Sequence, residues 1–330
     1  MDQQSHLPSY DDIAAAASRI KGFARTTPLI ESVATSEACN ARIFLKAETL
    51  QHTGSFKFRG AFNLISQLSA EQKSKGVVAY SSGNHAQAVA KVASLGNIKA
   101  TIVMPSDAPQ IKIDATQNFG AQTVLYDRYT ESREDIAAII VEETGATLVP
   151  PYDHPHTIAG QGTVGLEIAE QLTELDCVPD AVLVPCSGGG LVAGIATAIQ
   201  HHFSDTQIYA IEPEGFDDTA RSLTSGVRET IDNGAKSICD ALLVPTPGQI
   251  TFAINQRLLS GGYKVTDAMV QRAMGFAFLQ EKLVVEPGGA VALAALLNSV
   301  DEFSGKTVVA VLSGGNVDPA TFNKAISETP

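Results

Sequence analysis

The chain has 330 residues, of which 44% are hydrophobic and 18% charged, and it carries a formal net charge of -13. This composition is typical of a globular protein, and a chain of this length is expected to form two domains of roughly 150 residues each. No apolar run approaches the roughly 20 residues that a membrane helix needs. The negative charge repels phosphate backbones, and no Lys/Arg cluster offsets it. We therefore expect neither a membrane nor a nucleic acid as partner.

Short apolar, β-branched runs alternate with longer amphipathic stretches along most of the chain. The apolar runs predict strands at residues 41–46, 76–81, 100–105, 122–127, 180–185, 207–212 and 306–313. The amphipathic stretches predict helices at residues 84–95, 111–119, 132–144, 157–175, 191–200 and 267–281. Continuous hydrophobicity within the strands indicates burial on both faces, as in parallel sheets covered by helices. The predicted fold class is α/β, with a boundary near the proline-containing residues 148–156.

The first 20 residues are polar and acidic before they become amphipathic, so we expect no secretory leader. The four cysteines stand far apart and form no CxxC pair: Cys39, Cys177, Cys186 and Cys239. This spacing favours buried free thiols over disulfides. Both features predict a cytoplasmic protein.

A triple glycine follows the predicted strand at 180–185. The segment Ser187-Gly188-Gly189-Gly190 leads directly into a helix-like stretch. Backbone N–H groups and the positive end of the helix dipole would then face one point, which favours an anion such as a phosphate. The loop lacks the spacing of a nucleotide P-loop and of a dinucleotide site, so the phosphate belongs to another kind of ligand. A plain tight turn is the alternative.

Two further polar glycine turns follow predicted strands. Ser81, Ser82, Asn84 and His85 gather where the helix at 84–95 begins, and their groups would bind a carboxylate there. The alternative is an ordinary N-cap by Ser82 or Asn84, with His85 on the surface. The third turn, at residues 313–316, ends the last strand. Turns at the carboxyl ends of strands in an open α/β sheet meet at one crevice.

Lys57 stands between two phenylalanines in "TGSFKFRGA". A solvated surface lysine fits poorly with Phe56 and Phe58 as neighbours. A lysine that forms a Schiff base with an aldehyde must be partly desolvated, so that its neutral amine is accessible. Lys57 meets this requirement.

Five motifs in order resemble one enzyme family: "TGSFKFRGA", "SSGNH", "AGQGT" at 159–163, "SGGGL" and the final "LSGGN". They are similar to pyridoxal-phosphate enzymes of the tryptophan-synthase-β fold, fold type II, in the branch of serine/threonine dehydratases and serine racemases. The resemblance implies two open, mostly parallel sheets covered by helices, and no regulatory C-terminal domain is expected. It also implies a large cofactor-binding domain of residues 1–52 and 151–330, a small mobile substrate-binding domain of residues 53–150, and a homodimer.

The resemblance also implies residue roles. Lys57 would carry the cofactor, Phe56 would lie against its ring, Asn84 would bind the ring hydroxyl and Ser313 would face the pyridine nitrogen. The phosphate would be held by Ser187, Gly188, Gly189, Gly190 and Leu191. The substrate carboxylate would be bound by Ser81, Ser82, Asn84 and His85, with help from Arg133.

A hydroxyl opposite the pyridine nitrogen makes the ring a milder electron sink than a carboxylate would, which favours elimination. Lys57 would remove the α-proton of a 3-hydroxy amino acid, and the products would be a 2-keto acid and ammonia. We expect an L-threonine/L-serine ammonia-lyase.

Ser82 also matches racemases and 3-hydroxyaspartate dehydratases, and in racemisation it would act as a second acid/base. Ala86, in contrast, matches the dehydratases. A serine racemase with side elimination, a dehydratase of 3-hydroxyaspartate or an aryl-serine, and a non-enzymatic binder of a phosphorylated metabolite remain alternatives.

An acidic loop, "EPEGFDD", follows the strand at 207–212. Its spacing allows oxygen ligands to surround a hard cation, although acidic loop residues are more often merely solvated. In the racemase-like branch the matching residues bind magnesium through Glu212, the carbonyl of Phe216 and Asp218. Asp217 would replace Asp218 if the register slipped by one.

Overall fold

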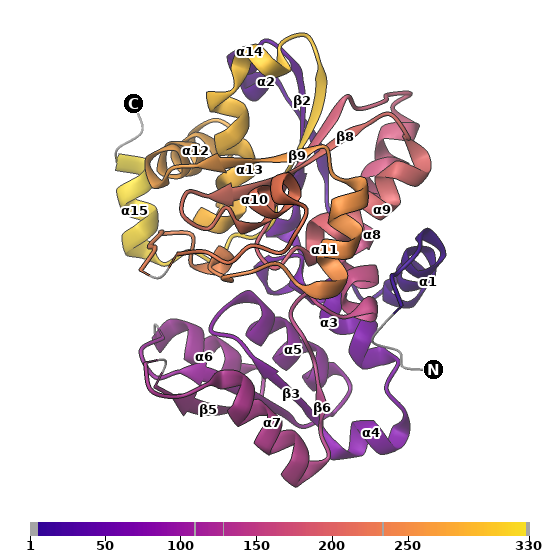
Figure 1. Ribbon diagram of the computed structural model, residues 1–330, viewed down its shortest axis with the longest axis vertical. Coiled ribbons are helices and arrows are strands. Elements are labelled where there is room, and N and C mark those ends of the chain that lie inside the picture. Colours follow the sequence, from indigo (N-terminus) through magenta and orange to yellow (C-terminus); the bar gives the residue numbers. More distant parts are fainter. Residues whose placement is uncertain (1–5, 109, 128, 233, 328–330) are drawn as a thin grey trace.

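The computed structural model describes residues 6–108, 110–127, 129–232 and 234–327. Within these ranges, no helix is both long and apolar enough to cross a lipid bilayer. The strands form two sheets, and Figure 1 shows them one above the other, with the cluster of α3 to α7 below and the larger remainder of the chain above.

The larger sheet has six strands. Their order is β1 (Leu29–Ser32), β2 (Arg42–Ala47), β10 (Thr307–Leu312), β7 (Ala181–Pro185), β8 (Gln207–Pro213) and β9 (Gly261–Val265). All neighbouring strands pair in parallel except β1, which pairs antiparallel with β2. Successive side chains of β2 enter different cores: Ile43 and Leu45 pack with one helical layer and Phe44 with the other. Burial on both faces explains the continuous apolar runs of these strands.

The smaller sheet has four parallel strands. Their order is β5 (Gln122–Tyr126), β4 (Ala100–Pro105), β3 (Val77–Tyr80) and β6 (Thr147–Leu148). The helices around it are α3 (Lys57–Ser66), α4 (Ala70–Lys75), α5 (Asn84–Leu95), α6 (Gln110–Asn118) and α7 (Arg133–Thr144). All four strands lie between residues 53 and 150, while the exact domain boundaries and the mobility of the small domain stay predictions.

The remaining helices belong to the larger part of the chain. They are α1 (Tyr10–Ile20), α2 (Val33–Cys39), α8 (Pro155–Glu174), α9 (Gly190–His202), α10 (Asp218–Ser225), α11 (Gln249–Leu258), α12 (Asp267–Leu279), α13 (Pro287–Asn298), α14 (Val300–Phe303) and α15 (Pro319–Ser327). Short 3-10 turns occur at η1 (Glu48–Leu50), η2 (His52–Gly54) and η3 (Asp240–Leu242).

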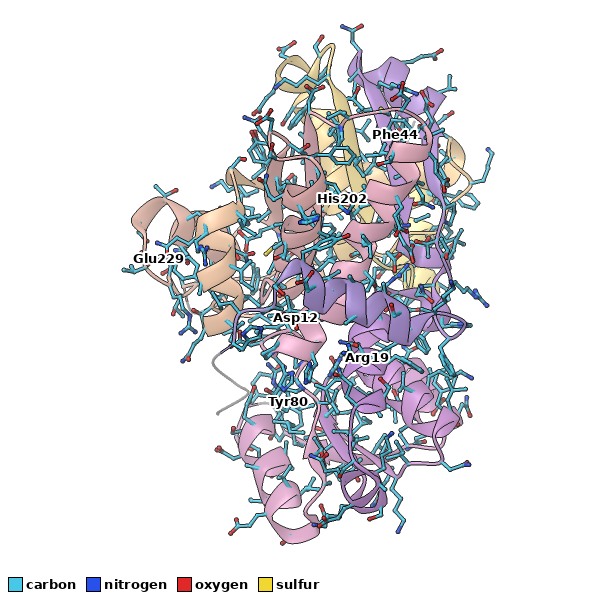
Figure 2. The ribbon with its side chains drawn as sticks, turned by 90° about the vertical axis from the view of Figure 1, so that its right-hand side faces the viewer. Asp12, Arg19, Phe44, Tyr80, His202 and Glu229 are labelled. Carbon is cyan, nitrogen blue, oxygen red and sulfur yellow. The ribbon has the colours of Figure 1, made fainter. Side chains whose placement is uncertain are left out.

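Helix α1 connects distant parts of the fold. Its N-terminus is fixed by a capping box between Ser9 and Asp12. Tyr10 stacks on His201 at the end of α9, and the Arg19 guanidinium donates to the Asn63 side chain on α3. In the side view of Figure 2, Asp12 and Arg19 lie between the larger sheet and the part of the chain that carries Tyr80.

The α/β class and the predicted strands are confirmed, with ends that differ by a residue or two. The sequence reasoning missed β1, β6 and β9. β1 and β6 have only four and two residues, too few to form a recognisable apolar run. β9 contains Gly261 and Gly262, which have low β propensity. All four cysteines are buried free thiols, as expected.

Candidate active site

A cavity of about 250 Å³ opens beside the residues that follow β3, β7 and β10. The three glycine turns therefore meet at one place. The cavity is lined by all the predicted cofactor and substrate residues: Phe56, Lys57, Ser81, Ser82, Asn84, His85, Arg133, Ser187, Gly188, Gly189, Gly190, Leu191 and Ser313. Their individual roles stay predictions.

Lys57 begins helix α3 in the wall of the cavity. Its ammonium donates to the carbonyl of Pro151 at 2.7 Å and lies 4.9 Å from the centre of the Phe56 ring. The surrounding protein replaces water and lowers the pKa of Lys57 to about 8. The alternative of an ordinary solvated lysine is therefore wrong, and a neutral amine is available near physiological pH.

The glycine loop forms the entrance to α9. Gly189 has a φ of +91°, a conformation that favours glycine, and caps a helix that begins at Gly190. The first N–H groups of a helix have no partner within it, and its dipole places positive charge there. The Ser187 hydroxyl accepts from the backbone N–H of Val244, which anchors the loop to the segment that follows η3. This donor set fits the phosphate of pyridoxal phosphate, with Lys57 in the same cavity for its aldehyde.

The turn after β3 does not follow the simple N-cap interpretation. The cap of α5 is Gly83, without a side-chain hydrogen bond to the helix. The Asn84 amide instead donates to Glu286 and accepts from Asn316 at 2.7 Å. His85 is 3% exposed, so it is not a surface residue. Burial, with a further contribution from Lys57, lowers the pKa of His85 to about 3, and its imidazole is neutral at physiological pH.

Two backbone hydrogen bonds join the lysine segment to the turn after β10. The Phe56 N–H donates to the Ser313 carbonyl at 3.2 Å, and the Gly315 N–H donates to the Gly54 carbonyl at 2.9 Å. Ser313 is thereby held beside Phe56 in the cavity wall. Arg133 lies across the cavity at the start of α7, 5.3 Å from the centre of the Tyr80 ring.

Three charged residues in the lining escaped the sequence reasoning: Lys112, Asp240 and Glu286. Glu286 is 2% exposed, and burial, reinforced by the charge of Asp240, raises its pKa to about 8. The available signal was an acid at the end of an apolar run, directly before the Pro287 that starts α13. Lys112 and Asp240 had no such signal, because they are 128 residues apart in sequence and form an ion pair only in the fold.

The three predicted metal ligands lie outside the cavity lining, at the end of β8 and the start of α10. Both carboxylate oxygens of Glu212 accept backbone N–H groups, from Thr219 at 3.0 Å and Ala220 at 2.9 Å. Both oxygens of Asp218 are buried without a partner, whereas Asp217 is only partly buried. In the described part of the chain, no three His, Cys, Asp or Glu side chains gather as a metal site would require. The orphaned Asp218 oxygens nevertheless fit a cation bound with the help of carbonyl ligands.

Comparisons with known proteins identify the family of the chain. A family model described as pyridoxal-phosphate dependent enzyme matches residues 20–314. The chain is 43% identical over 321 residues to an L-threo-3-hydroxyaspartate ammonia-lyase of Saccharomyces cerevisiae, covering 97% of each chain. It is 40% identical to an L-threonine ammonia-lyase of Thermotoga maritima, covering 96% of this chain and 78% of the relative. The structure of maize serine racemase superimposes with a TM-score of 0.90 at 37% identity, over 98% of both chains.

These similarities extend over nearly the whole chain and agree with the cavity, its lysine and its glycine loop. They leave no support for the alternative of a cofactor-free binding protein. The relatives differ among themselves in substrate and reaction, although each resembles this chain to a similar degree. The chain belongs to the pyridoxal-phosphate-dependent enzymes of fold type II, the family of serine racemases, threonine dehydratases and hydroxyaspartate ammonia-lyases.

Proposed function

We propose that this enzyme is an ammonia-lyase that converts a small 3-hydroxy amino acid, L-serine or L-threonine, into a 2-keto acid and ammonia. The observation that carries the proposal is the desolvated amine of Lys57, which shares one cavity with the glycine loop and the polar turn after β3. Pyridoxal phosphate, when bound, supplies an aldehyde that joins amines and a ring that withdraws electrons.

Different residues of this chain bind the cofactor, bind the substrate and move the proton. The loop of residues 187–191 holds the phosphate through backbone N–H groups, and Ser81 and Ser82 bind the substrate carboxylate beside Asn84. Lys57 takes the α-proton as general base, which its lowered pKa of about 8 supports. Ser313 presents a hydroxyl rather than a carboxylate to the ring, and this favours elimination.

Serine racemisation is the second candidate. Ser82 lines the cavity and would serve as the second acid/base, and the similarity to maize serine racemase supports this role. The similarity to the yeast enzyme supports 3-hydroxyaspartate as a further substrate.

The test supplies L-serine and L-threonine separately to the loaded enzyme and measures keto acid and D-amino acid in the same samples. We expect pyruvate and 2-oxobutanoate with little D-product, and a loss of at least about 10²-fold in Lys57→Ala. A Ser82→Ala variant that keeps elimination would assign Ser82 to carboxylate binding. Abundant D-serine that disappears in Ser82→Ala would establish the racemase instead.

We also propose a Mg²⁺ ion held by Asp218, Glu212 and the Phe216 carbonyl. Burial raises the pKa values of Glu212 and Asp218 to about 8 and 7, so without a cation the two carboxyls are not both ionised near neutral pH. Mg²⁺ should raise the melting temperature of the wild type and of Asp217→Asn, but not that of Asp218→Asn. The reverse order for the two variants would move the site to Asp217.

The proposal includes a cytoplasmic homodimer. The four buried free thiols support a reducing compartment. Analytical ultracentrifugation of the loaded enzyme tests the dimer.

A further inference from the structure

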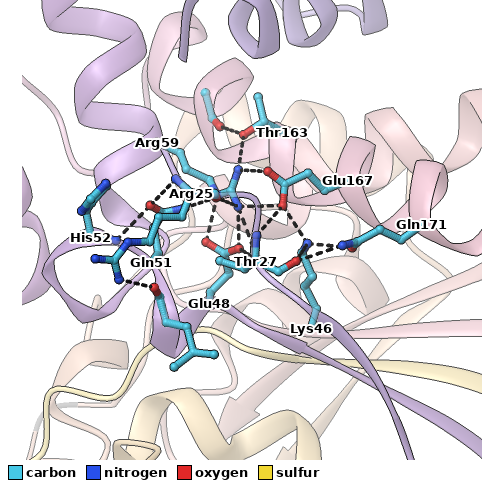
Figure 3. A network of polar contacts seen from close by, with 12 residues as sticks. Arg25, Thr27, Lys46, Glu48, Gln51, His52, Arg59, Thr163, Glu167 and Gln171 are labelled. Atoms are coloured by element: carbon cyan, nitrogen blue, oxygen red, sulfur yellow. Dashed lines mark hydrogen bonds and ion pairs between the residues drawn. The ribbon is translucent and has the colours of Figure 1, made fainter. Parts of the chain in front are cut away.

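Two residues after Lys57, Arg59 enters a buried cluster of ion pairs (Figure 3). Its guanidinium binds Glu48 through two hydrogen bonds of 2.8 Å and Glu167 through two of 2.6 and 2.9 Å. Lys46 adds a second cation, 2.7 Å from Glu167. The side chains of Arg59, Glu48 and Lys46 are fully buried, and that of Glu167 is 15% exposed. Two cations and two anions make the cluster neutral.

Stability alone does not explain such a cluster. Desolvation of buried ions cancels much of their attraction, so apolar residues of similar volume often give equal or greater stability. A guanidinium paired on two sides does provide direction, because its donors form a rigid planar fork. The acidic partners of Arg59 lie on η1 and α8, so the fork fixes the first turn of α3 against both elements.

Close backbone contacts continue this connection to the phosphate loop. A Cβ added at Gly160 of α8 would lie 2.6 Å from the Arg59 carbonyl, so α3 and α8 touch at this point. A Cβ added at Gly194 of α9 would lie 2.6 Å from Gly162 of α8. Helix α9 begins at Gly190, in the glycine loop. Lys57 and the loop therefore lie at the ends of one tightly packed stack of α3, α8 and α9.

Apart from Arg59, the first turn of α3 is supported by Phe58, which is fully buried and lies against the rings of His52 and Phe62, while the polar contacts of this turn are few. Its N-cap residue, Phe56, makes no side-chain cap hydrogen bond. Its backbone N–H donates to Ser313, and the Lys57 ammonium bonds only to the Pro151 carbonyl among the hydrogen bonds of the described residues. Arg59 is thus the charged anchor nearest to the reactive amine.

We propose that Arg59 is a positioning residue, which sets the Lys57 amine at the distance from the phosphate loop that the rigid cofactor requires. The inference rests on the proposed role of Lys57. The neutral amine of Lys57 would add to the aldehyde carbon, a C=N bond would replace the C=O bond, and the aldehyde oxygen would leave as water with both protons of the amine. Since a misplacement of about 1 Å is able to cost on the order of 10²-fold in such a reaction, a shift of α3 would disfavour formation of this bond and leave the phosphate and ring contacts in place.

The test compares two ligands of the apoprotein. Pyridoxal phosphate binds through its phosphate, its ring and the bond to lysine, whereas pyridoxamine phosphate has no aldehyde and uses only the phosphate and ring. Because the chain contains no tryptophan, equilibrium dialysis with absorbance detection is the suitable measurement. Borohydride reduction followed by mass spectrometry then gives the fraction of Lys57 that is joined to the cofactor.

In Arg59→Met we expect the affinity for pyridoxal phosphate to fall by at least about tenfold, equivalent to about 1.4 kcal/mol, while the affinity for pyridoxamine phosphate stays within about twofold. Arg59→Lys retains the positive charge but lacks the planar guanidinium, and it replaces Arg59→Met in the test if that variant does not fold. It should show the same selective loss to a smaller extent. The matched control is Lys46→Met, which removes a cation from the same cluster but from β2. It should lower the melting temperature and leave the ratio of the two affinities unchanged.

A purely structural role for Arg59 predicts a different pattern. Equal weakening of both ligands in the Arg59 variants, or the same selective loss in Lys46→Met, would overturn the proposal. Lys57→Ala tests the underlying assignment separately: if this variant still prefers pyridoxal phosphate over pyridoxamine phosphate, another lysine carries the cofactor and the proposed function fails at that point.

Discussion

At the scale of single residues, burial sets the charge states around the cavity. Burial favours the neutral forms of Lys57 and His85, because little water surrounds them, and it lowers their pKa values to about 8 and 3. The pKa of Glu286 rises for the same reason. The cavity wall is therefore less charged at neutral pH than its residue types imply. Reactive groups with shifted pKa values are typical of active sites.

Glu286 yields a stability prediction. Its folded pKa of about 8 lies above the ordinary value of 4.5, so between these pH values the folded protein holds a proton that the unfolded chain has lost. Stability then falls as pH rises through this window, by up to about 1.4 kcal/mol per pH unit. Glu286→Gln should remove this part of the slope and gain stability relative to the wild type toward pH 8, in melting curves of the apoprotein. Parallel pH curves for the two proteins would show that Glu286 is ionised throughout.

At the scale of elements, α8 organises the site through small residues. Gly160 and Gly162 let α3 and α9 approach its backbone, and Glu167 on the same helix receives Arg59 and Lys46. The sequence pattern predicts a helix at 157–175, and within it "AGQGT" is recognisable only as a motif shared with the family. The reason for its glycines appears only when the three helices are packed together.

Gly162→Ala separates helix propensity from packing. Propensity alone predicts a gain of up to about 1 kcal/mol, since alanine favours helices. The added Cβ would lie 2.8 Å from Ile13 and 2.9 Å from the Gly194 carbonyl, so we expect a net loss of about 1–3 kcal/mol from overpacking. The control is Glu170→Ala at an exposed position of the same helix, which should change stability by less than about 0.5 kcal/mol. A higher melting temperature for Gly162→Ala would mean that the helices separate without cost.

At the scale of the whole molecule, the cavity lies between two sheets. Besides the buried pairs of Arg59, a more exposed ion pair also joins the two parts of the fold. Lys112 on α6 belongs to the smaller part of the fold, and Asp240 on η3 to the larger. Asp240 is 50% exposed, so the pair is worth less than about 1 kcal/mol and salt screens it.

Lys112→Met should therefore increase amide hydrogen exchange in α6 by no more than about fivefold at low salt, and the difference should vanish at high salt. Hydrogen exchange with mass spectrometry measures this. Lys75→Met provides the control, because Lys75 pairs with Glu71 within α4 alone. Faster exchange in α6 for the control as well would indicate a general loss of stability rather than a lost connection between the two parts.

Sequence reasoning predicted most of the fold and the lining of the site, for reasons visible in particular segments. Runs of apolar and β-branched residues indicate the strands at 41–46 and 306–313. The consecutive glycines indicate the loop at 187–190. β9 was missed because Gly261 and Gly262 weaken its propensity, and its pairing with β8 comes from tertiary context. Glu286 was missed because its hydrogen bond is to Asn84, 202 residues away, and only the fold brings the two side chains together.

The sequence by itself determined the α/β class, the three glycine turns, the candidate lysine and the family resemblance, because periodicity, backbone freedom and local motifs are properties of short segments. Only the tertiary structure decided which charges meet: Arg59 with Glu48 and Glu167, Lys112 with Asp240, and Glu286 with Asn84. It also decided the shifted pKa values, since desolvation depends on what the whole fold places around a group.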